Sequence, residues 1–588
     1  MKRKILLIYP EIPATYWSFK YALSFVGYKT LMPPLGLITV AAMMPENYEL
    51  KLIDMNTGPL RDEDILAADM VFLSAMIVQK DSFQNVVSRC NRLGTPIAAG
   101  GPYPTNAYQN IQGVDYFILN EAEITLPRFL EDLDKGTPKK IYRDETKPEI
   151  TQTPIPRFDL LDLSAYSTMA LQSSRGCPFN CEFCDIIEMF GRVPRYKHPD
   201  QFIGEMERLH EAGYRGPLFI VDDNFIGNKK KVRELLESII EWQEARNHPF
   251  TLFTEASINL AQDEPLVDLM VRAGFTSVFI GIETPITATL TATQKQQNTK
   301  MDILESIRLI QARGIEVMAG FIVGFDSDPE NIFDLQIEFI QKAGIPMAMI
   351  GTMIALPNTQ LYRRLEREGR IIRETDGNNT HSLEMNFIPR MPAETIKAGY
   401  KKIIASIYRP KNYFTRCRTL LKRMPQKNGR QRPITANDLR AAGRSLYRQT
   451  FSRYGLHYLG LLASTLLRNP KQIAGAINLA VKGHHFFKMT SDIIKADETS
   501  ESMRAAVSEL EERMENRMGD GKGINPAAIQ RLGARAQNRI YRLYKKLNPE
   551  LKDYLKETYD DLQMKCETIT YLGMENTVSH EDILMNQI

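Results

Sequence analysis

Short apolar runs alternate with helix-length segments in two series along this chain of 588 residues, and this alternation limits the folds it can adopt. The first series has runs at 4–9, 48–54, 70–75, 96–101 and 116–119. The second has runs at 169–174, 217–223, 250–257, 277–283, 315–324 and 347–356. Strands that alternate with helices form parallel sheets whose faces the helices cover. We therefore predict an α/β protein, with a doubly wound, Rossmann-like domain over 1–150 and a partial (β/α)6 barrel over 160–375.

A proline-rich linker separates the two series, and a helical region follows the second. The linker spans 137–160, and its four prolines are Pro138, Pro148, Pro154 and Pro156. Prolines at this density interrupt regular structure. From about residue 376 the strand-like runs cease, which predicts a mostly α-helical C-terminal domain over 376–588.

Composition and cysteine usage indicate a globular protein of a reducing compartment. Hydrophobic residues make up 43% of the chain and charged residues 25%, which is typical of globular domains. Six cysteines are too few for a disulfide framework at this length. The basic start at 1–10 lacks a small-residue cleavage site and reads as a strand. The apolar run at 454–467 is too short to cross a bilayer. We expect a cytoplasmic protein, with membrane association as the further option.

Positive charge is concentrated in one segment of the predicted C-terminal domain. The chain has a formal net charge of +3, yet residues 401–488 contain nineteen Lys or Arg and one acidic residue, Asp438. The excess of 18 positive charges in this segment leaves −15 for the rest of the chain. Such a block indicates an anionic partner.

The basic segment is open to three interpretations. Its aromatic residues and its apolar run at 454–467 suit a surface that rests on anionic lipid. The same residue types also suit a groove for RNA phosphates and stacked bases, and a solvated helical face is the third option. Apolar runs of helix length alternate with the charges, so we favour the membrane over nucleic acid.

Three cysteines in eight residues give the strongest chemical signal. Cys177, Cys181 and Cys184 follow directly after the first strand of the second series, with the spacing Cys-x3-Cys-x2-Cys. Three thiolates on one loop suit three irons of a 4Fe–4S cluster and leave the fourth iron open. A structural zinc site requires a fourth ligand, and the nearest histidine, His198, lies beyond a proline-containing loop. We predict the iron–sulfur cluster over zinc or three unrelated core cysteines.

This motif, with Phe183 before the last cysteine, resembles that of the radical S-adenosylmethionine superfamily. The resemblance implies that the open iron holds S-adenosylmethionine, and that one electron cleaves it to a 5′-deoxyadenosyl radical that abstracts hydrogen. The superfamily's contacts to S-adenosylmethionine fall at the ends of its barrel strands. The corresponding residues in this chain are Phe183, Asp222, Asp223, Asn224, Glu255, Ser257, Glu283, Gly320, Gly324 and Leu356. No catalytic acid or base is assigned.

The first series resembles the cobalamin-binding domain of cobalamin-dependent radical enzymes. Its ligand is expected at the carboxyl ends of the strands, where the candidate residues are Asp54, Asn56, Ser74, Gly100, Gly101 and Tyr103. Asn56 stands where related domains carry histidine, and no histidine precedes His198. We therefore predict cobalamin without a lower imidazole ligand from this domain. The alternative is a flavodoxin-like domain without a cofactor.

Longer segments are similar to a cobalamin-dependent subgroup that includes hopanoid C-2 methylases. These segments are 18–45, 181–197, 221–230, 254–261 and 355–361. The resemblance implies a methyltransferase that acts on an unactivated sp3 carbon, with a lipid or terpenoid as the candidate substrate. It also implies a one-electron reductant such as flavodoxin or ferredoxin. The alternatives are a ring-forming or rearranging radical enzyme with cobalamin and, from another class, an RNA-modifying or RNA-binding protein.

Overall fold

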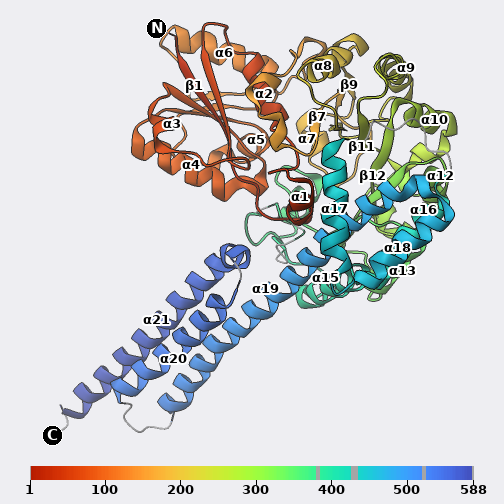
Figure 1. Ribbon diagram of the computed structural model, residues 1–588. Coiled ribbons are helices and arrows are strands. Elements are labelled where there is room, and N and C mark those ends of the chain that lie inside the picture. The colour runs from red at the N-terminus through yellow and green to blue at the C-terminus, as the bar shows by residue number, and fades with distance from the viewer. Residues whose placement is uncertain are drawn as a thin grey trace. The chain divides into compact units, whose positions relative to one another are not determined.

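The computed structural model describes residues 2–375, 377–378, 380, 385–425, 435–519, 525–547 and 549–585. They form two units, Met1–Phe487 and Lys488–Ile588. The predicted fold class is confirmed, because two parallel sheets are followed by helices (Figure 1). The boundary between the units falls inside the predicted C-terminal domain, at the end of its basic segment 401–488.

The N-terminal sheet has six parallel strands in the order β2-β1-β3-β4-β5-β6. Their bounds are β1 (Lys4–Tyr9), β2 (Glu49–Asp54), β3 (Met70–Ser74), β4 (Ile97–Gly100), β5 (Tyr116–Ile118) and β6 (Ile141–Tyr142). The first five match the predicted runs, and the two-residue β6 is too short for a sequence pattern to reveal. The strand order reverses between β1 and β3, which is where doubly wound sheets bind their ligands.

Helices cover both faces of this sheet, as the predicted doubly wound fold requires (Figure 1). Alternate residues of each strand face opposite sides. Leu6 and Ile8 of β1 pack with α3 (Asp62–Leu66) and α4 (Lys80–Leu93). Ile5 and Leu7 pack on the other face with α2 (Leu35–Ala42) and α6 (Ala122–Asp134). Two shorter helices, α1 (Lys20–Val26) and α5 (Pro102–Ala107), complete this part of the chain.

The second sheet is the predicted partial barrel, with six parallel strands in the order β14-β13-β12-β11-β10-β7. Their bounds are β7 (Met169–Leu171), β10 (Pro217–Ile220), β11 (Thr251–Glu255), β12 (Phe275–Glu283), β13 (Glu316–Val323) and β14 (Ala348–Thr352). β7 and β14 do not pair with each other, so the barrel is open. The carboxyl ends of the six strands form one rim, which is where functional residues of such folds lie.

Four helices of the barrel begin at polar side chains that accept backbone N–H groups, which fixes where these helices start. Such caps are Asn228 for α9, Asp263 for α10, Asp302 for α12 and Thr359 for α14. The helices are α7 (Ile186–Phe190), α8 (Pro199–Glu211), α9 (Lys229–Ala245), α10 (Glu264–Ala273), α11 (Thr287–Ala292), α12 (Ile303–Ala312), α13 (Ile332–Ala343) and α14 (Gln360–Arg367).

Four helices and the start of a fifth complete the first unit. They are α15 (Ala393–Ile407), α16 (Pro410–Arg423), α17 (Ala436–Thr450), α18 (Gly455–Arg468) and the first part of α19 (Ile473–Gly519). Arg416 of α16 is buried and donates hydrogen bonds to Ile345 O (2.7 Å) and Gln341 Oε1 (2.9 Å) of the barrel. Some charges of the basic segment are therefore internal.

The second unit packs the rest of α19 with α20 (Pro526–Lys545) and α21 (Pro549–Met585) around one apolar core. Met503, Leu510, Ile529 and Leu555 are among its buried residues. Among the residues that the structure describes, no helix is both long enough and apolar enough to span a bilayer.

Candidate functional site

A short antiparallel ribbon holds the cysteine loop at the carboxyl end of the first barrel strand. β8 (Ser174–Arg175) pairs with β9 (Arg195–Tyr196), and the loop between them carries all three cysteines of the motif. Gly176 has φ +97°, and a Cβ there would lie 2.9 Å from Gly191 O. The tight start of the loop therefore requires glycine.

Asp222 and Asp223, at the end of β10, connect the second strand to the start of the cysteine loop. Asp222 is buried and accepts hydrogen bonds from Ser173 N (2.7 Å) and Ser174 Oγ (2.7 Å). Asp223 Oδ2 accepts the N–H of Gly176 at 2.8 Å. Burial raises the pKa of Asp223 to about 7, although the Gly176 hydrogen bond lowers it. Both predicted residues therefore lie beside the loop, and Asp222 supports its backbone.

The predicted residues Asn224 and Ser257 form the next contact around the rim. Asn224 Oδ1 accepts the Ser257 N–H at 3.2 Å, and Asn224 Nδ2 lies 4.0 Å from Cys177 Sγ. The amide therefore connects the third strand end to the first cysteine. Gln297 makes a similar contact, since its Nε2 lies 3.6 Å from Cys181 Sγ. Donors directed at thiolate sulfur stabilise its charge.

Lys295 brings a cation to the cysteine loop. Its Nζ lies 2.7 Å from Glu283 Oε1 and 5.9 Å from the centroid of the Phe183 ring. Burial alone would lower the pKa of Lys295, but Glu283, Cys181 and Cys184 together raise it above its usual value. Lys295 thus connects the predicted residues Phe183 and Glu283 to the cysteines. No sequence motif indicated this lysine.

Glu255 is a mostly buried carboxyl group close to this charged cluster. Burial, with the neighbouring Asp223 and Glu283, raises its pKa to about 7, although Lys295 lowers it. In the described part of the chain, the Glu255 side chain has no hydrogen-bond partner. A buried carboxyl group with a raised pKa is a typical feature of a ligand-binding site.

Of the remaining predicted residues of the barrel rim, Gly320 lies on the fifth strand, and Gly324 and Leu356 follow the fifth and sixth strands. Gly320 faces the ring of Phe279, which a Cβ would approach to 3.1 Å. Gly324 donates its N–H to Asp328 Oδ2 at 2.9 Å, and Leu356 O accepts from Thr359 Oγ1 at 2.7 Å. Gly320 allows the ring of Phe279 to pack against its strand, whereas the polar groups of Gly324 and Leu356 bond within the protein.

Asp54 and Asn56, at the end of β2, are occupied by contacts within the protein. Asp54 is buried and accepts from Asn56 Nδ2 (2.7 Å) and Tyr166 Oη (3.0 Å). Asn56 Oδ1 accepts the Ile12 N–H at 2.7 Å. These bonds fix the turn that follows β1, so Asp54 and Asn56 shape the edge of the sheet. Their direct contact with cobalamin stays a prediction.

Ser74, Gly100 and Gly101 lie together at the same edge of the sheet, because β3 pairs with β4 from Val71 to Ser74. Gly101 has φ +88°, and a Cβ there would lie 2.5 Å from Ser74 Oγ. Tyr103 packs its ring at right angles to Phe83, 5.4 Å away. Bare backbone beside a hydroxyl group allows the close approach of a flat ligand, which is compatible with cobalamin; contact with it stays a prediction.

Buried ion pairs join the edge of the N-terminal sheet to the cysteine loop. Glu121, which follows β5, contacts Arg175 Nη1 at 2.8 Å and Arg195 Nη2 at 2.8 Å. Glu123 contacts Arg175 Nη2 at 2.9 Å. Arg175 is two residues before Cys177, so this network fixes the N-terminal domain directly against the loop. The sequence did not indicate this network: Arg195 lies in the similar segment 181–197, but nothing there pairs it with Glu121 or Glu123.

The donor set of the loop fits the iron–sulfur cluster that the resemblance implies. All six cysteines are free thiols, and the three of the motif lie with Lys295 and Gln297 at one rim of the barrel. In the described residues, no group of three or more His, Cys, Asp or Glu side chains surrounds a single metal ion. Cysteines that bind different irons of one cluster need not converge on one point.

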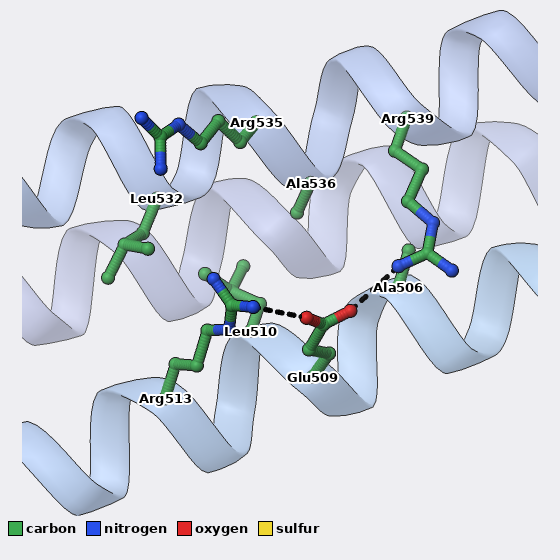
Figure 2. A pocket seen from close by; sticks show the side chains of 8 residues that line it. All are labelled: Ala506, Glu509, Leu510, Arg513, Leu532, Arg535, Ala536 and Arg539. Atoms are coloured by element: carbon green, nitrogen blue, oxygen red, sulfur yellow. Dashed lines mark hydrogen bonds and ion pairs between the residues drawn. The ribbon is translucent and has the colours of Figure 1, made fainter.

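A pocket in the second unit is separate from these residues. It has a volume of about 170 Å³ and lies between α19 and α20 (Figure 2). Its lining has one acid and three arginines: Glu509 contacts Arg513 Nη2 at 2.5 Å and Arg539 Nη1 at 2.7 Å, and Arg535 is the third arginine. None of the predicted site residues lines it.

Three family models match this chain. A B12-binding domain matches residues 25–130, the radical SAM superfamily matches 171–350, and a domain of unknown function (DUF4070) matches 359–499. The first two coincide with the N-terminal sheet and the open barrel. The third covers part of the predicted helical C-terminal domain.

Named relatives cover most of the chain. An uncharacterized methyltransferase of Synechocystis sp. is 42% identical over 495 residues, which are 82% of this chain and 91% of the relative. The hopanoid C-2 methylase of Rhodopseudomonas palustris is 33% identical over 413 residues, which are 69% of this chain and 77% of the relative.

Two solved structures share the fold. TsrM from Kitasatospora setae, a radical S-adenosylmethionine methyltransferase with cobalamin and a [4Fe-4S] cluster bound, matches with a TM-score of 0.53 and 14% identity. The match covers 82% of this chain and 99% of TsrM. The cobalamin-dependent enzyme OxsB, with aqua-cobalamin bound, matches with a TM-score of 0.53 and 15% identity, over 84% of this chain and 81% of OxsB.

Proposed function

This chain belongs to the cobalamin-dependent radical S-adenosylmethionine methyltransferases, and from that premise we propose that it methylates an unactivated sp3 carbon of a hydrophobic, polycyclic lipid. Its cofactors are a 4Fe–4S cluster, S-adenosylmethionine and cobalamin. When bound, they supply hydrogen abstraction and a transferable methyl group. The protein must hold the lipid between them and keep water away from the reacting carbon.

The observation that carries the proposed substrate class is the apolar inner face of the barrel. Phe219 and Phe253 are directly paired in adjacent strands, and their rings stack 4.6 Å apart. Phe279 is directly paired with Glu255, so it faces the same side of the sheet as that predicted contact. All three rings are partly exposed, whereas the alternate residues Leu218, Leu252 and Val278 are buried under the helices.

Trp17 extends this apolar face beyond the strands. Its ring packs edge-on against Phe279, 5.0 Å away, and it comes from the segment that follows β1. Aromatic rings offer large apolar contact area to a hydrocarbon; the three phenylalanines carry no polar side-chain atom, and Trp17 carries only its indole N–H. The hydrocarbon skeleton of a polycyclic lipid matches this chemistry, as does the substrate class named for the hopanoid C-2 methylase.

The chain's own residues have separate tasks in this reaction. Cys177, Cys181 and Cys184 are the residues that would hold the cluster, and Gln297 and Lys295 direct a donor and a positive charge at the sulfurs. Glu255 is a carboxyl group positioned to bind or release a proton near pH 7. The partly exposed rings orient the lipid. The proposed reaction also requires an external one-electron donor, such as flavodoxin or ferredoxin.

Isotope transfer tests the reaction and separates its alternatives. The anaerobically reconstituted enzyme is supplied with S-adenosylmethionine deuterated in its methyl group, a one-electron reductant, total lipid extract and total RNA. We expect the label in the lipid fraction by mass spectrometry, and none with Cys177→Ala. An altered lipid that lacks the label would establish the ring-forming alternative instead, and label confined to RNA would establish the RNA-modifying one.

A substitution in the barrel tests the substrate face. Phe253→Asp places a charge among the rings and should lower lipid methylation at least about tenfold, because apolar binding area is lost. Release of 5′-deoxyadenosine without lipid should continue, since the cysteine loop is unchanged. Phe253→Leu keeps the side chain apolar and is the matched control. Equal methylation by Phe253→Asp and Phe253→Leu would contradict the assignment of this face to the substrate.

A further inference from the structure

Helix α18 is apolar on both of its faces, although only one face is packed. Tyr458, Leu461 and Leu462 are buried against the first unit. On the opposite face Leu456 and Leu467 are each 87% exposed. The outward face of a helix on a globular protein is normally polar. An unpacked apolar face on a helix of fourteen residues therefore needs a partner.

More exposed apolar side chains lie at the turn that joins α17 to α18. Tyr447 and Phe451 lie there, with their rings 5.9 Å apart, and Phe451 is 81% exposed. We define the apolar rim as the exposed side chains Tyr447, Phe451, Leu456, Leu459, Leu466 and Leu467. Single exposed apolar side chains are ordinary, but a cluster of this size marks an interaction surface.

The charges that border the apolar rim are basic. Arg453 lies between Phe451 and Leu456 in the chain, and Arg468 and Lys471 follow Leu467; all three side chains are exposed. In the described part of the chain these three have no ion-pair partner. Asp438 is the single acid of the basic segment, and its carboxyl group accepts the Thr435 N–H at 2.7 Å at the start of α17.

Other basic residues of the segment have partners inside the first unit. Arg444 donates to Phe25 O at 3.1 Å, Arg448 donates to Ser24 Oγ at 3.2 Å, and Lys482 pairs with Glu316 at 2.9 Å. Residues 426–434 of the segment lie outside the described part of the chain. The excess of 18 positive charges therefore overstates what the surface offers, and the three bordering residues are the relevant ones.

We propose that the apolar rim and its bordering residues Arg453, Arg468 and Lys471 dock the enzyme on the surface of an anionic phospholipid membrane. Apolar and aromatic side chains that project from a helix surrounded by basic residues enter the boundary between headgroups and acyl chains. The basic residues meet the negative surface potential of such a membrane. The helix lies in the interface, which accords with its fourteen-residue length.

This inference does not rest on the proposed methyl transfer, because vesicle binding requires neither substrate nor turnover. The test uses the full chain and sedimentation with vesicles of phosphatidylcholine alone or with phosphatidylglycerol. We expect binding that increases with phosphatidylglycerol. Added salt should release only part of the protein, since salt screens the charges but not the buried apolar surface. No binding to phosphatidylglycerol vesicles would overturn the proposal.

Paired substitutions separate the apolar rim from general charge. Phe451→Glu with Leu456→Glu should lower vesicle binding about tenfold or more, because both side chains would have to leave the interface. Leu66→Glu with Leu572→Glu makes the same change in charge at two other exposed leucines and should lower binding much less. Cobalamin and iron contents, with circular dichroism, show that both variants fold.

If something other than a membrane binds the apolar rim, these experiments give different results. If the apolar rim binds a second copy of the chain, light scattering should detect a dimer, and Phe451→Glu with Leu456→Glu should dissociate it. The protein would then not bind vesicles. An RNA surface predicts tight RNA binding that salt abolishes and no preference for anionic vesicles. Either result would replace the membrane as the partner. Equal vesicle binding by the two paired variants would remove the apolar rim from the interface.

Discussion

Single residues set the electrostatics of the cysteine loop. Lys295 supplies a positive charge beside Cys181 and Cys184, and Glu283 holds that charge in place at 2.7 Å. Gly281 makes the pair possible, because a Cβ there would lie 2.8 Å from Lys295 Nζ. Glu283 itself has φ +66°, a conformation that non-glycine residues rarely adopt. Such strain is characteristic of functional sites.

Lys295→Met should destabilise the barrel, because it leaves the buried carboxylate of Glu283 without a partner. The loss should be about 3 kcal/mol in the free energy of unfolding. Urea unfolding of the metal-free chain, followed by the fluorescence of the buried Trp242, measures it. Lys295→Met combined with Glu283→Gln should recover most of the loss. A double variant no more stable than the single one would show that the pairing does not matter.

Asp328 makes the stability of the fifth-strand loop depend on pH. Burial raises its pKa to about 7, although the N–H groups of Gly324 and Phe325 lower it. The folded-state pKa exceeds the ordinary value of 3.8, so the folded chain holds this proton more tightly than the unfolded chain. The contribution of Asp328 to stability is therefore present below about pH 4 and is lost as the pH rises through about 7.

Asp328→Asn removes this titration. Its thermal midpoint, relative to the unchanged chain, should be higher at pH 8 than at pH 5. Calorimetry of the metal-free chain at the two pH values provides the measurement. Asp334→Asn changes an aspartate on the exterior of α13 and should show no such difference. The prediction fails if the midpoint difference for Asp328→Asn is the same at both pH values.

At the scale of elements, one ion network determines how the cobalamin domain meets the cysteine loop. Glu121 leads into α6, Arg175 belongs to β8 and Arg195 belongs to β9. Glu121 is 5% exposed, so its two arginine contacts replace the water that the carboxylate would otherwise bind. Breaking such a pair leaves uncompensated buried charge, which is far more costly than loss of a surface pair.

Glu121→Gln should loosen the ribbon of β8 and β9 and speed hydrogen exchange in residues 176–194. The expected cost is about 3 kcal/mol, because Arg195 and Arg175 lose a buried partner. Exchange monitored by mass spectrometry on the anaerobic holoenzyme measures the effect. Glu131→Gln in the same domain removes an exposed pair with Lys135 and is the matched control. Similar exchange in the two variants would contradict the structural role of Glu121.

At the scale of the whole molecule, the placement of histidines bears on how cobalt is held. No histidine precedes His198 in the sequence. His210 packs against Trp242 on the exterior of the barrel, and His484 contacts Tyr454 Oη at 2.5 Å. His381 lies outside the described residues. His484 packs against Phe25 and His485 stacks on Phe19, both in the segment that follows β1, so both rings are engaged in contacts within the protein.

Electron paramagnetic resonance of the reduced Co(II) holoenzyme should therefore show no superhyperfine splitting from an axial protein nitrogen. The physical reason is the absence of an imidazole from residues 1–197, which contain the whole B12-binding match. A spectrum unchanged by ¹⁵N-histidine labelling is the internal control. Splitting that responds to this label would show that a histidine from elsewhere in the chain reaches the cobalt.

The sequence by itself determined the sheets, the order of the domains and the cysteine loop. Strands such as 4–9 and 277–283 are continuous apolar runs between helix signals, and that local pattern survives folding because parallel strands are buried on both faces. The spacing of Cys177, Cys181 and Cys184 is also local, since one loop carries all three. Likewise, strand-end residues such as Asp223 and Glu255 were predictable, because parallel strands end at one edge.

Only the tertiary structure decided which side chains surround the cysteine loop and which apolar surfaces stay exposed. Lys295 and Glu121 come from loops with no periodic pattern. Lys295 acts on the cysteines and Glu121 on the arginines that flank them, through contacts distant in sequence. Asp54 and Asn56 matched a motif position but bond within the protein. The apolar run at 454–467 did not reveal which of its faces would be packed. Local pattern encodes which elements form, whereas long-range packing determines which groups are buried, paired or left exposed.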